Sequence, residues 1–321
     1  MTTARGRVAS FSGLLLLGLL SASTVSGGTI YNFESCNTVY PTPIGVWNNG
    51  PPTGCDGWYT PTGPTAQGTV YPYSLLNQAF GITADPAGGN YVLGLTGNGS
   101  GTTQTYDRAQ HDFTFSSAAA WTVTYDLSVF NGNSSGSTYD TNYIGGFSVL
   151  TAGFNSAQSA FIVDYAWDDS SASSTWSPVF WIYDANGDLL NPDGVVVWTG
   201  LSQNHWYSES TVFDEDSNRI VRVSITDLTA NATATFAPGN WYMAGGAAGA
   251  TSEPNAFRFS GLGQNNAVLV DNVSLSSVPE PATFLLMGAG IIALIAFRRR
   301  GRLSCAVPCA EDHGRSPVDE P

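Results

Sequence analysis

Short segments in which apolar and polar residues alternate recur along most of this chain, and each ends at Gly, Asn, Asp or Ser. Because successive side chains of a strand point to opposite faces of a sheet, such alternation is typical of strands with one buried face. No helical periodicity persists over three turns. We expect eleven strands, at residues 91–95, 109–115, 121–130, 144–151, 160–166, 179–183, 195–199, 206–213, 220–228, 256–261 and 267–275.

This strand pattern predicts an all-β domain at residues 28–277, folded as an antiparallel two-sheet sandwich. The segment 219–227 illustrates the alternation. We expect Val221, Val223 and Ile225 to share its buried face, and Arg222, Ser224 and Thr226 to share the other.

The charge of this domain is strongly negative. All eleven basic residues of the chain are arginines, and residues 28–277 contain four of them against twenty acidic residues, a formal charge of −16. Such a surface repels a phosphate backbone, which excludes nucleic acid as a partner. A neutral sugar or a cation is the partner that this charge suits. The nine Trp and fourteen Tyr residues argue for a packed core.

The N-terminus has the organisation of a secretory signal peptide. Arg5 and Arg7 precede an apolar run at residues 14–20, and small residues follow as far as residue 28. The apolar run is too short to span a bilayer. We therefore assign residues 1–27 to a signal peptide, with cleavage between residues 22 and 28.

The other end contains a proline-rich element, an apolar stretch and a basic cluster. These are Val278-Pro279-Glu280-Pro281, residues 282–297, and Arg298-Arg299-Arg300. As a helix the apolar stretch covers about 24 Å, slightly less than the ~30 Å hydrocarbon core. Arginines favour the cytoplasmic side, so the large domain is expected outside the inner membrane.

This order of elements resembles the PEP-CTERM sorting signal of exported bacterial proteins, over residues 278–302. The resemblance implies that a membrane-embedded exosortase recognises Pro279-Glu280-Pro281 and cuts near it. The protein would be anchored in the inner membrane transiently and then reach the cell surface or the extracellular matrix. Residues 303–321 continue beyond the usual end of such tails and are predicted to be a disordered cytoplasmic segment. The alternative is a permanent single-pass anchor.

Two further segments resemble known sandwich domains. Residues 267–275, Ala-Val-Leu-Val-Asp-Asn-Val-Ser-Leu, look like the closing strand of jelly-roll sugar-binding domains. The stretch 206–227, in which an aromatic strand leads through a turn into an alternating strand, resembles concanavalin-like sandwiches. The resemblance implies a jelly-roll fold and contributes no diagnostic site.

The four cysteines fall into two pairs. In an oxidising compartment Cys36 and Cys55 would close a loop of about twenty residues, worth about 3 kcal/mol, and the alternative is two free thiols. Cys305 and Cys309 lack two further ligands for structural zinc.

Signatures of catalysis are weak. The domain contains two histidines, His111 and His205, and no Gly-x-Ser-x-Gly element. The Glu-x-Asp-x-x-Glu pattern of concanavalin-like glucanases is also missing, and its carboxylates would have to flank one bond about 5 Å apart. We therefore expect no enzyme activity and no catalytic residue.

Two candidate binding sites remain. Asp184, Asn186 and Asp188 place three oxygen side chains at alternate positions, as in a calcium loop, although Asn-Gly at this point also predicts a plain hairpin turn. A structural calcium ion is thus the one cofactor considered. Trp176 follows Ser-Ser-Thr in a polar loop and is the expected exposed sugar-binding aromatic.

The sequence thus supports an exported, exosortase-processed surface or exopolysaccharide-matrix protein, non-catalytic and glycan-binding. The alternative is a secreted glycan-active hydrolase with an unrecognised site.

Overall fold

The structure, a computed structural model, describes residues 29–36, 42–43, 55–61, 66–67, 69–96, 107–113, 120–131, 143–150, 159–168, 174–249, 254–262 and 266–278. The predicted signal peptide, the sorting helix and the C-terminal segment lie outside these residues. Within the described part, no helix has both the length and the apolar character needed to cross a membrane.

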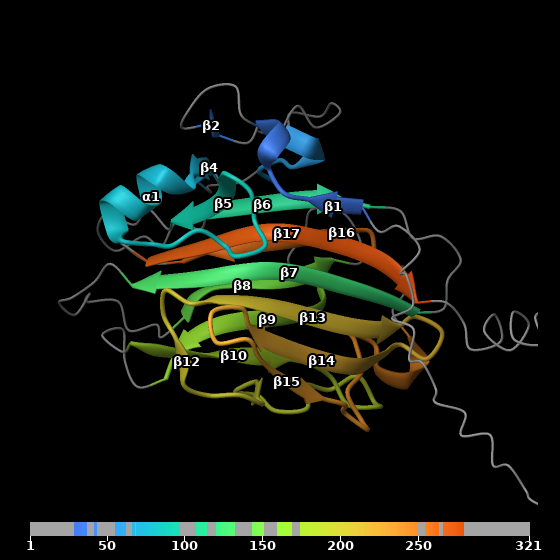
Figure 1. Cartoon of the computed structure of the whole chain (residues 1–321). Coiled ribbons are helices and arrows are strands. Elements are labelled where there is room, and N and C mark those ends of the chain that lie inside the picture. Colours follow the sequence, from blue (N-terminus) through green and yellow to red (C-terminus); the bar gives the residue numbers. More distant parts are fainter. Residues whose placement is uncertain are drawn as a thin grey trace, which may run out of the picture.

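The described strands form two sheets (Figure 1). The first sheet has nine strands, in the order β15-β14-β13-β7-β17-β5-β4-β2, with β1 also paired to β17. Its strands are β1 (Thr29–Tyr31), β2 (Thr42–Pro43), β4 (Thr69–Pro72), β5 (Tyr91–Thr96), β7 (Ala120–Asn131), β13 (Trp206–Asp214), β14 (Arg219–Asp227), β15 (Ala232–Phe236) and β17 (Asn266–Val278).

The second sheet lies behind the first in the view of Figure 1. Its order is β11-β10-β9-β8-β16-β6-β3, with β12 also paired to β10. Its strands are β3 (Ala66–Gln67), β6 (Asp107–Asp112), β8 (Tyr143–Leu150), β9 (Ser159–Trp167), β10 (Thr175–Trp181), β11 (Val195–Val196), β12 (Leu201–Ser202) and β16 (Ala256–Gly261). All the strand pairs are antiparallel except β3 with β6.

The chain changes sheet repeatedly. β5 belongs to the first sheet, β6 to the second, β7 to the first and β8 to the second, and the last two strands again lie in opposite sheets. Strands distant in sequence therefore become neighbours, as in a jelly roll. The predicted antiparallel two-sheet jelly-roll sandwich is confirmed.

The core fills the space between the sheets. Its buried side chains include Trp58, Tyr125, Phe147, Phe213 and Phe259, and all five are fully buried. The aromatic rings meet edge-on or tilted, for example Tyr125 against Phe259 with centroids 5.0 Å apart. Burial of this many large rings is the main stabilising contribution expected in such a sandwich.

A smaller apolar cluster lies on the outer face of the first sheet, where the helix α1 (Tyr73–Phe80) packs. Tyr73 and Leu76 of this helix contact a cluster that contains Trp206 and Leu269. The Trp206 Nε1–H also donates to the carbonyl oxygen of Thr83, 2.8 Å away. Helix α1 and β15 were not expected from the alternation, because both are short.

The orientation predicted for Val221 is wrong. Ile220, Val223 and Ile225 are buried, whereas Val221 is 45% exposed. Val212 pairs with Arg222 and Phe213 pairs with Ile220, so Val221 is an extra residue in a β-bulge. Beyond the bulge, Arg222, Ser224 and Thr226 face away from the core as expected.

Two short 3-10 helices, η1 (Glu34–Cys36) and η2 (Cys55–Gly57), are joined by a disulfide between Cys36 and Cys55, whose Cα atoms lie 5.2 Å apart. Cys55 lies three residues before Trp58, whose ring is tilted against Phe33 and Phe257 of the core. The disulfide therefore connects the N-terminal segment to a region that inserts a fully buried tryptophan.

Replacing both cysteines, Cys36→Ser with Cys55→Ser, should lower the free energy of unfolding by about 3 kcal/mol, because the unfolded chain regains the entropy of an open loop. Urea unfolding followed by tryptophan fluorescence measures this change. A double variant as stable as the wild type, or a wild-type protein that reacts with two equivalents of thiol reagent, would contradict the disulfide.

Candidate functional site

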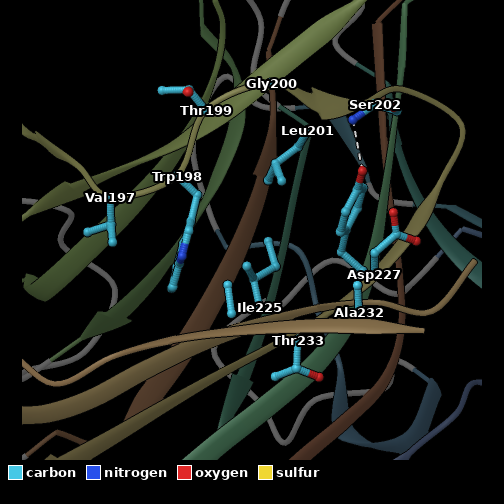
Figure 2. A pocket seen from close by; sticks show the side chains of 12 residues that line it. Val197, Trp198, Thr199, Gly200, Leu201, Ser202, Ile225, Asp227, Ala232 and Thr233 are labelled. Carbon is cyan, nitrogen blue, oxygen red and sulfur yellow. Dashed lines mark hydrogen bonds between the residues drawn. The ribbon is translucent and has the colours of Figure 1, made fainter. Parts of the chain in front are cut away.

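A pocket of about 490 Å³ opens at the edge of the sandwich where the two sheets separate (Figure 2). Residues 197–202, between β11 and β13, form one wall. The inward side of β14 and the edge strand β15 form the other, through Ile225, Asp227, Ala232, Thr233 and Ala234. The pocket thus lies between the ends of both sheets.

Trp198 provides the aromatic surface of this pocket. Its side chain is partly exposed, and its ring contacts the buried Phe180 edge-on at 6.1 Å. Figure 2 shows Trp198 and Leu201 on the side opposite Ile225 and Ala232. Thr199, Ser202, Asp227 and Thr233 are also among the lining residues, so the lining contains hydroxyl and carboxylate residues as well as an aromatic one.

Hydrogen bonds from neighbouring strands fix the wall that carries Trp198. The Tyr207 hydroxyl accepts the Ser202 N–H at 2.8 Å. Asp168, at the end of β9, accepts the Gly200 N–H at 3.0 Å. Gly200 has a φ of +76°, a conformation that other residues rarely adopt. The wall is therefore a constrained loop.

A histidine–aspartate pair lies at one end of the pocket. The His205 Nδ1 is 3.0 Å from the Asp227 Oδ2, and 36% of the histidine side chain is exposed. The other oxygen of Asp227 accepts the N–H groups of Thr229 and Ala230, at 2.8 Å each. Partial burial opposes ionisation, but these bonds, with that of His205, hold the pKa of Asp227 below its usual value.

The expectation for Trp176 is wrong. Its side chain is fully buried, with its ring edge-on to those of Tyr165 and Tyr207. In the second sheet it pairs with Trp167 of β9. Trp176 does not lie in the polar loop, because β10 already begins at Thr175. Trp198, in contrast, is partly exposed. The sequence predicted a strand as far as residue 199, but β11 ends at Val196 and Trp198 lies beyond it.

The segment Asp184–Asp188 forms a tight turn. Asp184 Oδ1 accepts the N–H groups of Asn186 at 2.8 Å and Asp188 at 3.1 Å, and Gly187 has a φ of +88°. Tyr183 pairs with Leu189 across the turn. These local hydrogen bonds are sufficient to stabilise the turn without a metal ion. Calcium binding by Asp184, Asn186 and Asp188 stays a prediction.

Three carboxyl groups are buried together on the outer face of the first sheet. Asp85, Asp126 and Asp271 are at most 5% exposed, and Asn272 donates through Nδ2 to both Asp85 and Asp126 at 3.0 Å. The Tyr73 hydroxyl donates to Asp271 at 3.0 Å. Burial raises the pKa of Asp85 to about 7 and that of Asp271 to about 8, so both retain protons above the usual range.

A fourth acid, Glu209, is fully buried between the sheets. Burial raises its pKa to about 8. Neither of its oxygens has a hydrogen bond of normal geometry, although the Tyr125 hydroxyl is close enough to lower the pKa in part. A group enclosed in this way does not reach a substrate, so Glu209 is not a candidate acid catalyst.

Metal ligands gather at one further place. Within the described residues, Cys36, Cys55 and Asp56 form the set of three Cys, His or acidic side chains whose ligand atoms all lie within 4.8 Å of one another. The disulfide uses both sulfur atoms, and a disulfide is not a thiolate ligand. The fit to a metal ion is therefore poor while the disulfide is intact.

Comparison with known proteins identifies the C-terminal element. Residues 277–300 match the PEP-CTERM protein-sorting motif. This confirms the sorting motif predicted from Pro279-Glu280-Pro281 and the arginine cluster, which lies outside the described residues. The chain is thus an exported protein with a sorting signal of the kind handled by exosortase. No curated protein matches the chain.

Solved structures similar to the chain include a peanut lectin with a nine-residue peptide, at 14% identity over 61% of this chain and 88% of the lectin, with a TM-score of 0.36. Lectin II from Ulex europaeus has 11% identity over 59% and 87%, with a TM-score of 0.37. An endo-β-1,4-glucuronan lyase from the fungus Trichoderma reesei has 12% identity over 74% and 94%, with a TM-score of 0.36. These likenesses are at the level of the fold.

The buried acids predict an unusual dependence of stability on pH. Because the folded-state pKa values of Asp85, Asp271 and Glu209 are raised, the folded protein binds more protons than the unfolded one between about pH 4 and pH 8. The free energy of unfolding should therefore fall as the pH rises from 5 to 9. In Asp271→Asn the fall should be smaller by at least about 1.4 kcal/mol, the worth of one pKa unit.

The exposed Asp188→Asn serves as the control and should follow the wild type. Chemical unfolding at a series of pH values, with EDTA present, measures the effect. A stability that instead rises with pH would mean that the carboxylates of this cluster are stabilised in their ionised form.

Proposed function

We propose that this protein is a non-catalytic component of the cell surface or of the exopolysaccharide matrix, and that its sandwich binds polysaccharide through the pocket beside Trp198. An exosortase would release it from the inner membrane by cutting at the sorting signal. The proposal requires no cofactor. The sorting motif supports the route, and the pocket supports the binding.

The observation that carries the proposal is the position of Trp198. Sugar rings bind to aromatic faces through their apolar C–H surfaces, while nearby hydroxyls and carboxylates bind the sugar hydroxyls. The lining contains both kinds of residue, with the Trp198 ring on one wall and Ser202, Asp227 and Thr233 among its polar residues. Its lining contains no basic side chain, which favours a neutral sugar over an acidic one.

One observation favours the alternative of a glycan hydrolase. His205 is oriented by Asp227, as a general base is oriented in many hydrolases. In the described part of the chain, however, the His205 ring forms no hydrogen bond with a hydroxyl nucleophile, and its bonded partner is Asp227 alone. The pair then serves to close the turn after β14 and to shape the pocket rim.

Trp198→Ala should weaken binding of the protein to polysaccharide by at least about tenfold, because it removes the aromatic surface of the pocket. The measurement is retention of the purified protein on exopolysaccharide from the exporting cells. Phe236→Ala is the matched control, since Phe236 is 37% exposed and does not line the pocket. Equal loss in both variants, or loss in neither, would contradict the assignment.

Incubation of the same protein with that exopolysaccharide should release no reducing ends and no unsaturated products above the level of buffer alone. Reducing-sugar assay and absorbance at the wavelength of unsaturated uronic acids test these two outcomes. Release of reducing ends without unsaturated products, lost in His205→Asn but kept in Phe236→Ala, would establish the hydrolase instead.

A further inference from the structure

The outer face of the first sheet carries an array of hydroxyl side chains that do not line the pocket. Three adjacent strands, β7, β13 and β14, each place two hydroxyl side chains on this face: Thr122, Thr124, Ser208, Ser210, Ser224 and Thr226. We refer to these six residues as the hydroxyl face. All six are partly exposed, whereas the residues that alternate with them, such as Val123, Thr211 and Val223, are buried.

The strand register makes this face a regular array. Ser210 pairs with Thr124 on one side and Ser224 on the other, and Thr226 pairs with Ser208. Neighbouring strands lie about 4.8 Å apart, and alternate residues of one strand about 6.6 Å apart. The hydroxyls therefore recur at regular intervals in two directions. Thr124 Oγ1 donates to Ser210 Oγ at 3.2 Å. Figure 1 shows β7, β13 and β14 side by side, with α1 over a different part of the sheet.

Charge is almost absent from the hydroxyl face. The outward neighbours that carry charge lie at its two ends: Arg222, Asp214 and Arg219 at one end, and Asp126, 5% exposed, at the other. This contrasts with a domain that has twenty acidic residues between positions 28 and 277. The six residues themselves carry neither a basic group nor a carboxylate, so the centre of the face does not select for an acidic or a basic polymer.

Apolar side chains contribute little surface between the six hydroxyls. Val212 is 6% exposed and Trp206 is fully buried in the cluster beneath α1, whereas the bulge residue Val221, 45% exposed, lies beside Arg222 at one end of the face. Stable interfaces between copies of one protein usually have an apolar or aromatic centre. What this face does offer is a set of hydroxyls, each of which both donates and accepts hydrogen bonds. Sugar hydroxyls have the same dual capacity.

We propose that the hydroxyl face is a second binding surface, and that its ligand is an extended, neutral polysaccharide chain. Each hydroxyl contributes only a weak contact, because it exchanges a hydrogen bond to water for one to the sugar. A long chain engages many such contacts at once, so its affinity rises with length although each unit binds weakly. The hydroxyl face and the pocket use opposite sides of β14, because Ile225 lines the pocket whereas Ser224 and Thr226 face outward. They meet at β15, where the hydroxyl of Thr226 lies 2.9 Å from that of Thr233.

The test uses the full exported protein and exopolysaccharide from the exporting cells, separated by anion exchange into neutral and acidic fractions and sized into long chains and short oligosaccharides. The triple variant Thr124→Val, Ser210→Ala and Ser224→Ala removes three adjacent hydroxyls with little change in volume. Its binding to long neutral chains should fall about tenfold, with unchanged binding of short oligosaccharides. Ser74→Ala, Thr83→Val and Ser174→Ala remove three exposed hydroxyls elsewhere and should bind as the wild type.

A triple variant that binds long neutral chains as the wild type does would overturn the proposal, as would wild-type protein that binds only the acidic fraction. Ser224→Lys provides a further test, because an added positive charge should strengthen binding only to an acidic chain. Trp198→Ala separates this proposal from that of the pocket. Loss of long-chain binding in the triple variant but not in Trp198→Ala would refute the pocket and support the hydroxyl face. Loss in Trp198→Ala but not in the triple variant would refute the hydroxyl face and support the pocket.

Discussion

Strand β17 determines how the rest of the sandwich is arranged. It lies between β7 and β5 in the first sheet and pairs with β7 along most of its length. Its inward residues Val268, Val270 and Val273 enter the core between the sheets. On the other face, Asp271 and Leu269 bind the loop after α1 and the helix itself. Because both faces of the strand are buried, this segment is apolar in sequence. The same burial raises the pKa of its one acid, Asp271.

The sequence was sufficient for the fold class and for most long strands, because a two-residue alternation over eight or nine residues leaves few other choices. It was not sufficient for β15, in which Phe236 is the one large apolar residue, or for the bulge at Val221, which depends on the partner strand. The sorting motif was predictable in full, since it is a local sequence feature that needs no tertiary contact.

The binding site was harder to predict. Exposure of a tryptophan depends on where a strand stops, and the sequence around Trp176 and Trp198 does not state that boundary. The burial of three aspartates under one loop also escaped prediction, because Asp85, Asp126 and Asp271 are widely separated along the chain. No local pattern marks such a cluster. The hydroxyls of β7, β13 and β14 were visible in the sequence one strand at a time, but only the register brings them into one array.

The proposed function depends on release of the sandwich outside the cell from the apolar segment 282–297, which is predicted to span the membrane. Val278 is the last residue of β17, and the Pro-Glu-Pro element of the sorting motif follows it directly in the sequence. The most direct measurement is the intact mass of the protein recovered from the cell surface or the medium. The account predicts a mass that lacks residues 282–297 and everything after them. A mature protein that still contains this apolar stretch would contradict it.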